Sequence, residues 1–233
     1  MAKVSLKDLL EAGAHFGHQA SRWNPKMKPY LYTVRDKIHI FDLAKTREGL
    51  EKACEYVKKT TAEGGKIIFV GTKRQAAAIV KEEAKKAGMP WVCQRWLGGT
   101  ITNWEQIKKN VEKLVEMKEK KEKGEYKKYT KKEQILIDRE IARLEKFFGG
   151  LVGLENLPAA IFVVDIKKEK TAVREANRKE IPVVAIVDSN SDPGLVDYVI
   201  PANDDAVGAI KLIVGAVAEA AKKGKEAFEK KKK

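Results

Sequence analysis

Two apolar runs decide the fold of this chain: AIFVV at 160–164 and VVAIV at 183–187. Both runs are continuous, without alternating polar residues, and each is followed directly by an acidic residue, Asp165 or Asp188. Strands with this pattern are buried on both faces, as in a parallel sheet that helices cover on each side. Residues 168–179 lie between the runs and have helical spacing of their apolar side chains. The sequence therefore predicts a strand-helix-strand unit here.

The same alternation continues on both sides of this unit. Downstream, a short strand at 198–200 leads to a final helix that Asn203 or Asp204 can cap. Upstream, strands and helices alternate again: strands are predicted at 38–41, 66–70 and 89–92, with helices at 43–61 and 73–87. We therefore expect an α/β domain built on a doubly wound, mostly parallel sheet with helices on both faces.

A segment rich in lysine and glutamate, 105–148, interrupts this alternation. Its apolar stripe fades towards a turn at 124–129 and then resumes; the stripe consists of Ile107, Val111, Leu114, Ile137, Ile141, Leu144 and Phe148. This pattern predicts an inserted antiparallel helical hairpin. Because its tip has little apolar surface, the hairpin is expected to project from the core. The alternative is a solvated helix pair with no partner.

The chain is accordingly divided into four parts. Residues 1–104 form the first part of the α/β domain with an N-terminal arm, 105–148 the protruding hairpin, 149–224 the second part of the domain, and 225–233 a basic tail expected to fray.

Composition points to an anionic partner. Of 233 residues, 47 are Lys or Arg and 33 are Asp or Glu, which gives a formal net charge of +14. Such an excess is typical of proteins that bind RNA, DNA or an acidic membrane surface; the alternative is a lysine-rich surface that only keeps the protein in solution. Hydrophobic residues make up 43%, enough for a full core.

The remaining composition favours a cytoplasmic protein. Cys54 and Cys93 stand alone, so neither a zinc finger nor a redox pair is indicated. Residues 1–8 mix charges and contain no apolar stretch typical of a signal peptide. No apolar run approaches 18 residues, so we expect no membrane segment and no membrane partner.

The motifs of nucleotide enzymes and hydrolases are missing. The chain contains neither G-x-x-x-x-G-K-[ST] nor G-x-S-x-G. Gly71 to Arg74 follows a strand and precedes a helix, a position where phosphates bind, but it offers a single glycine. We therefore predict no catalytic residues, no small-molecule substrate and no enzyme activity, with a nucleotide-dependent enzyme as the alternative.

Several acidic residues follow the predicted strands and are expected to face one crevice: Asp165, Asp188, Asp192, Asp204 and Asp205. Such a cluster could hold a divalent cation, with His18 as an additional ligand, although turn formation and helix capping explain some of the acids without a metal. No cofactor is predicted, and the weak candidates for a metal site are His18, Asp188, Asp204 and Asp205.

Two basic segments with aromatic residues are better candidates for a binding surface. Residues 22–30 contain Pro25 and Pro29, which predict an extended, non-helical arm. The turn RWLGGTITNW at 95–104 is free of acids, and its tryptophans either face a partner or belong to the core. The predicted RNA-binding residues are Arg22, Trp23, Lys26, Lys28, Lys73, Arg74, Arg95, Trp96, Thr100, Asn103, Lys108 and Lys109.

The chain also resembles the family of the bacterial small-subunit ribosomal protein numbered two. The resemblance covers nearly the whole length and rests on ordered motifs: GHQ at 17–19 with the 22–30 arm, IHIFDL at 38–43, FVGTKRQ at 69–75, RWLGGTITN at 95–103, DSNSDP at 188–193 and PANDDA at 201–206. Ser189 and Ala202 stand where the family often has Thr and Gly.

This resemblance implies a flavodoxin-like α/β domain with a protruding helical hairpin, held between the head and body of the small ribosomal subunit. It implies binding to small-subunit ribosomal RNA and to neighbouring ribosomal proteins, including the large one that captures messenger RNA. It implies no catalysis. A polyanion-binding protein outside the ribosome is the other alternative.

Overall fold

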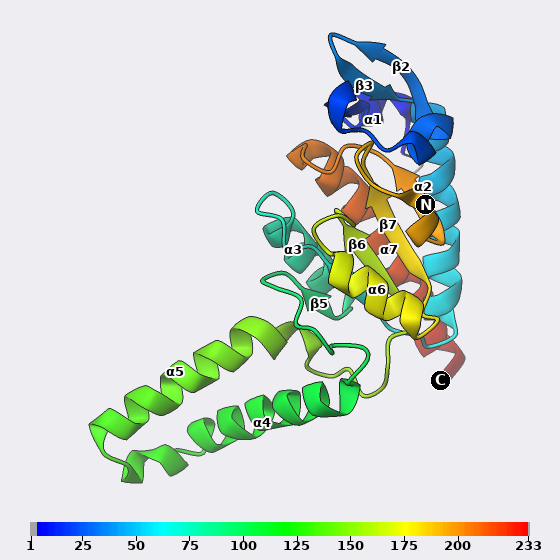
Figure 1. Cartoon of the computed structure of the whole chain (residues 1–233). Helices are drawn as coiled ribbons and strands as arrows, with labels where there is room; N and C mark the ends of the chain where they lie inside the picture. The colour runs from blue at the N-terminus through cyan, green and yellow to red at the C-terminus, as the bar shows by residue number, and fades with distance from the viewer. Residues whose placement is uncertain (1–3, 233) are drawn as a thin grey trace.

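A computed structural model describes residues 4–232, and its centre is a five-stranded parallel sheet (Figure 1). The strand order is β5-β4-β6-β7-β8. The strands are β4 (Ile67–Val70), β5 (Trp91–Val92), β6 (Ala160–Val164), β7 (Val183–Val187) and β8 (Tyr198–Pro201). Every residue of β4, β6 and β7 is buried, which confirms the prediction made from their continuous apolar runs.

Helices cover both faces of this sheet, as predicted. Alternate residues of each strand enter different cores: Ile67 and Phe69 belong to one, Ile68 and Val70 to the other. The first core is closed by α2 (Leu43–Ala62), α3 (Ala77–Ala87) and α7 (Val207–Lys232); the second by α6 (Lys170–Arg178) and the base of the hairpin. Helix α3 begins four residues later than predicted, because residues 73–76 form a turn.

A second, three-stranded antiparallel sheet contains β1 (Phe16–Gln19), β2 (Leu31–Arg35) and β3 (Ile38–Phe41), in the order β1-β3-β2. It follows a short helix, α1 (Leu6–Glu11). The prediction that 38–41 belongs to the parallel sheet was wrong. This strand instead pairs with β2 across a two-residue turn in which Asp36 and Lys37 have φ of 51° and 64°, the left-handed geometry of a tight hairpin.

The 22–30 segment is not an extended arm, which corrects the prediction made from its prolines. Ala20–Arg22 and Pro25–Tyr30 are 3-10 turns. Pro25 occupies the first position of its turn, where the missing N–H has no partner to lose, and the Asn24 side chain accepts a hydrogen bond from the Lys26 N–H. The turn buries Met27 completely.

The inserted segment forms the predicted helical hairpin from α4 (Trp104–Glu122) and α5 (Lys131–Phe148), which extends away from the sheet in Figure 1. Ion pairs join the two helices, each with the lysine on α4: Lys113–Glu140 at 3.3 Å, Lys121–Asp138 at 2.8 Å, and Lys118–Glu145. The apolar stripe is buried only near the base, at Ile107, Val111, Leu114, Ile141, Leu144 and Phe148.

The C-terminal helix continues further than predicted. α7 is helical to Lys232, so the expectation of a frayed tail from residue 225 was wrong; Lys233 lies outside the described residues. Gly224 does not end the helix but lets it approach α2: a Cβ there would lie 2.4 Å from the carbonyl oxygen of Lys58. The Phe228 ring packs against Gly64, where a Cβ would lie 2.7 Å from it. None of the described helices is long and apolar enough to cross a membrane.

Candidate functional site

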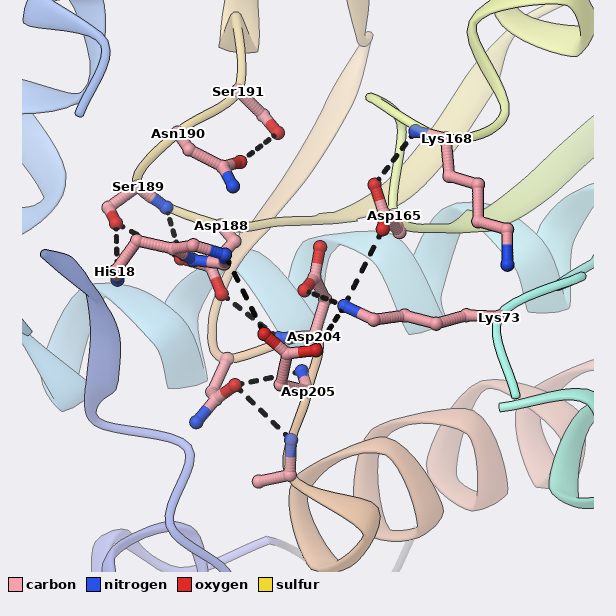
Figure 2. Close-up of polar contacts among 12 residues, drawn as sticks. His18, Lys73, Asp165, Lys168, Asp188, Ser189, Asn190, Ser191, Asp204 and Asp205 are labelled. Carbon is pink, nitrogen blue, oxygen red and sulfur yellow. Dashed lines mark hydrogen bonds and ion pairs between the residues drawn. The ribbon is translucent and has the colours of Figure 1, made fainter. Parts of the chain in front are cut away.

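Charged side chains from four strand ends meet at one edge of the parallel sheet (Figure 2). Lys73 comes from the loop after β4, Asp165 follows β6, Asp188 follows β7, and Asp204 and Asp205 lie beyond β8. The expectation that acidic residues gather at the carboxyl ends of the strands is therefore confirmed for these residues. In an open α/β sheet this crevice is where ligands bind.

A lysine occupies the centre of the acidic cluster. The Lys73 Nζ lies 2.6 Å from Asp204 Oδ1, 2.6 Å from Asp205 Oδ1 and 3.5 Å from Asp165 Oδ2. Burial by itself would lower the pKa of Lys73, but the hydrogen bonds to Asp204 and Asp205 outweigh it and raise that pKa above its ordinary value. Lys73, predicted to bind RNA, therefore acts as an internal counter-ion, and its side chain is only 13% exposed.

Asp204 is the most deeply buried acid that contacts this lysine, with 1% of its surface exposed. Burial, together with the carboxylates of Asp188 and Asp165, raises the pKa of Asp204 to about 7, although the contact with Lys73 opposes the rise. The cluster contains more carboxylates than cations. Because the pKa of Asp204 is about 7, the net charge of the cluster changes with pH near neutrality.

His18 supplies the second cation when it is protonated. Its Nδ1 lies 2.9 Å from Asp188 Oδ1, and its Nε2 lies 3.6 Å from Asp205 Oδ2. The hydrogen bond to Asp188 raises the pKa of His18, against a smaller opposite effect of burial. Asp188 is further held by hydrogen bonds from the backbone N–H groups of Ser189, at 2.5 Å, and Asp204, at 3.2 Å.

The four candidate metal ligands bind one another and Lys73. Within residues 4–232, no group of three or more His, Cys, Asp or Glu side chains has an arrangement suited to a metal ion. The position between Asp165, Asp204 and Asp205, where a cation would be attracted, already holds the Lys73 ammonium group. The acidic residues predicted as metal ligands thus hold His18 and, through Lys73, the loop after β4.

The N-terminal segment closes the crevice. The Asn24 N–H donates to the Ser189 carbonyl oxygen at 2.7 Å, and the His18 N–H donates to Ser189 Oγ at 2.8 Å. Gly17 is required for this approach, because a Cβ there would lie 2.8 Å from Ser189 Oγ. On the other side, the Asn203 N–H donates to the Ala14 carbonyl oxygen at 3.1 Å. These contacts attach the N-terminal segment to the loops that follow β7 and β8.

The loop that could have bound phosphate is also occupied. The backbone N–H of Thr72 donates to Glu169 Oε1 at 3.0 Å, and the Thr72 hydroxyl donates to the same oxygen at 2.5 Å. Glu169 is 3% exposed. A carboxylate thus takes the anion position after β4, and the geometry gives no support to a nucleotide-binding enzyme.

The environments of the three histidines predict how they titrate. His18 should have a pKa above the ordinary 6.5, while burial lowers the pKa of His15 and of His39 below it. An NMR titration of the imidazole signals checks this order, with His15 and His39 as internal references. A His18 pKa below that of either other histidine would contradict the described contact with Asp188, and Asp188→Asn should lower the His18 pKa.

The raised pKa of His18 also fixes the sign of its effect on stability. A group with a higher pKa in the folded protein stabilises the fold fully below its unfolded pKa, and this contribution is lost as pH rises through the folded value. The gap in unfolding free energy between wild type and His18→Gln should therefore be largest below about pH 6.5 and shrink at higher pH.

The 95–104 turn is built around a carboxylate that sequence reasoning missed. Glu175 on α6, 8% exposed, accepts five hydrogen bonds. The donors are Trp96 Nε1 at 3.1 Å, the backbone N–H groups of Gly99, Ile101 and Thr102 at 2.8, 3.0 and 3.1 Å, and the Thr102 hydroxyl at 3.1 Å. Burial would raise the pKa of Glu175, but these hydrogen bonds lower it overall.

The predicted RNA-binding residues divide by exposure. Trp96 and Thr100 are 6% and 3% exposed and belong to the interior, so the alternative explanation of that tryptophan as core is correct. Trp23 is half-buried, with its ring 4.9 Å from that of His39. The exposed members are Arg22, Lys26, Lys28, Arg74, Arg95, Asn103, Lys108 and Lys109, of which Lys26 pairs with Asp192 at 2.7 Å.

Comparison with known proteins gives one consistent result. The family model of ribosomal protein S2 matches residues 9–224. The chain is 52% identical over 221 residues to the small ribosomal subunit protein uS2 of Roseiflexus sp. (strain RS-1), covering 95% of this chain and 84% of the relative. It is 49% identical over 221 residues to the protein of the same name from Chloroflexus aurantiacus (strain ATCC 29366 / DSM 635 / J-10-fl), covering 95% and 93%.

Proposed function

Because the chain belongs to the ribosomal protein S2 family, we propose that it binds small-subunit ribosomal RNA and neighbouring ribosomal proteins between the head and body of the subunit. As a member of this family it is a structural constituent of the small ribosomal subunit and not an enzyme. The observation that carries the RNA part of the proposal is the net charge of +14, combined with basic side chains that remain exposed after the acids have taken their partners.

The proposed RNA surface comprises three exposed basic places. Arg22 and Lys28 lie on the N-terminal 3-10 turns, Arg95 lies on the turn that Glu175 organises, and Lys108 and Lys109 lie on the first turns of α4. None of these five side chains has an ion pair within the described part of the chain. They are therefore free to neutralise phosphates, whereas Lys73 is not.

An apolar patch supports the binding of neighbouring proteins, among which we include the large messenger-RNA-binding one. Leu10, Phe16 and Val207 are 53%, 47% and 54% exposed. Gly13 lies between them: its N–H donates to the Leu10 carbonyl oxygen at 3.0 Å, and a Cβ there would be 3.9 Å from the Phe16 ring and 3.8 Å from Ala206, which precedes Val207. Exposed apolar groups that cluster in this way are typical of protein contacts.

The salt dependence of RNA affinity tests the proposal. If about five phosphates are neutralised, the logarithm of the affinity for small-subunit ribosomal RNA should fall with the logarithm of salt at a slope of about −4. The double change Arg22→Glu and Lys28→Glu should weaken binding and flatten the slope.

Lys230→Glu with Lys231→Glu is the matched control, because it changes the net charge equally on exposed residues at the far end of α7. Equal losses for the two double variants would mean that only net charge matters. A salt-independent affinity would contradict the proposal itself.

A further inference from the structure

β2, the outer strand of the β2–β3 hairpin, is the most exposed strand of the N-terminal sheet. β2 pairs only with β3 among the described strands, so its other edge is free. Four of its five residues are exposed, and Tyr32, at 78%, has the highest exposure of the large apolar side chains described. In Figure 1 this hairpin lies at the opposite end of the molecule from the α4–α5 hairpin.

The tip of the hairpin has a basic character. Arg35 has a side chain 83% exposed, and its ion pair with the neighbouring Asp36, at 3.8 Å, is fully in solvent and hence weak. Lys37 is exposed, has no ion pair within residues 4–232, and stands at φ 64°, a conformation that disfavours residues other than glycine. Lys37 therefore places a positive charge at the turn, in a position where glycine or asparagine fits best.

Packing gives Tyr32 no role in the fold. Buried residues of the small sheet lie elsewhere: Phe41 is 2% exposed and His39 is 6% exposed, both on β3. Tyr32 leaves an aromatic ring in water on β2, and Arg35 and Lys37 lie at the tip of the same hairpin, so the hairpin carries both a stacking surface and phosphate-binding charges. Proteins that bind unpaired nucleotides use this combination.

We propose that the β2–β3 hairpin binds single-stranded RNA, with Tyr32 stacking on an unpaired base and Arg35 and Lys37 neutralising the adjoining phosphates. This rests on the proposed function and names a contact that the basic residues discussed above do not include. A protein strand added to the free edge of β2 is the competing occupant. The excess of positive charge at the tip, with Asp36 as its single acid, favours RNA.

Substitutions at Tyr32 distinguish the two occupants in the full chain, with protein-free small-subunit ribosomal RNA as the probe. Tyr32→Ala should weaken RNA binding about 10-fold, Tyr32→Phe should bind within about 2-fold of wild type, and Tyr32→Leu should resemble the alanine variant, because a base stacks on a ring and not on an aliphatic chain. Arg35→Ala with Lys37→Ala should weaken binding and reduce the steepness of the salt slope by about 1 to 2.

Lys230→Ala with Lys231→Ala serves as the charge control and should leave the RNA affinity near that of wild type. Melting curves that match the wild type show that each variant folds, as expected for exposed residues. If the hairpin variants bind RNA normally while wild-type binding stays salt-dependent, this inference fails and the proposed function stands.

Failure of the wild type to bind the RNA would instead remove the proposed function. Normal RNA binding by Tyr32→Ala, together with loss of a ribosomal-protein contact that Tyr32→Leu retains, would assign the hairpin to a protein partner and overturn the inference.

Discussion

Lys73→Met is expected to lower the free energy of unfolding by about 3–5 kcal/mol, the range for removing one partner of a buried ion pair. The change takes a cation away from three carboxylates and leaves Asp204, which is 1% exposed, without its 2.6 Å partner. Chemical unfolding followed by circular dichroism measures the loss. Methionine keeps most of the aliphatic chain but is one atom shorter, so the effect reports the loss of the ammonium group with its charge and hydrogen bonds.

The pH dependence of this loss has a predicted sign. The pKa of Asp204 is already raised to about 7, and without Lys73 it should rise further, so that the variant takes up a proton as pH falls. The stability gap to wild type should therefore narrow below about pH 7 and widen above it.

Lys168→Met is the matched control, since the Lys168 ammonium group donates to the Thr72 carbonyl oxygen on an exposed part of the same loop system. Lys168→Met should lower the free energy of unfolding by less than about 0.5 kcal/mol. If Lys73→Met and Lys168→Met lowered the free energy of unfolding by equally small amounts, the acidic cluster would be hydrated and its stability would not depend on Lys73. Adding Asp204→Asn to Lys73→Met should recover part of the stability.

Glu175→Ala is expected to lower the free energy of unfolding by about 3 kcal/mol or more, because it removes the acceptor of five hydrogen bonds. A buried donor left without a partner costs about 1–3 kcal/mol, and the donors at Trp96 and Ile101 are buried. Glu175→Gln should lower the free energy of unfolding by less than Glu175→Ala, because the amide keeps one oxygen that accepts hydrogen bonds. Some loss should remain, because its NH₂ group faces donors and cannot accept from them. Urea unfolding monitored by tryptophan fluorescence reports stability, and the signal reflects the environments of all four tryptophans, Trp96 among them.

Glu155→Ala, at an exposed residue, is the control, and its free energy of unfolding should stay within about 0.5 kcal/mol of that of the wild type. The lowered pKa of Glu175 means that its contribution is present above the ordinary pKa of 4.5 and is lost as pH falls through the folded value. A Glu175→Ala protein with wild-type stability and unchanged fluorescence would contradict this account of the turn.

Continuous apolar runs made the parallel sheet predictable. β6 and β7 could be located because strands buried on both faces contain only apolar residues, and the hairpin could be located because its apolar stripe repeats with helical spacing. The small antiparallel sheet was missed because β2 is exposed on four of five residues and therefore has no such run. The sequence of β3 predicted a strand, but it contained no signal that indicates which of the two sheets the strand joins.

The positions of the acidic residues in the crevice could be predicted, but the role of the lysine among them could not. Strand ends located Asp165 and Asp188, but nothing in the sequence near Lys73 distinguishes a lysine that neutralises buried acids from one that binds phosphate. Glu175 was hidden on a helix whose apolar neighbours, Ala172, Val173 and Ala176, define the packed face. Its only signal was indirect: a turn with several backbone N–H groups and no local acceptor needs an anion from elsewhere.

The closure of the crevice by the N-terminal segment has a consequence for how the chain is made. His18 and Ser189 are 171 positions apart, and Asn203 donates to Gly13 across 190 positions. At a synthesis rate of about 5–20 residues per second, the N-terminal segment waits roughly 10–40 s for its partners to be synthesised. During that interval Phe41 and Met27 have no completed core to enter. The first forty residues therefore complete these contacts only after residues 189–203 have been synthesised.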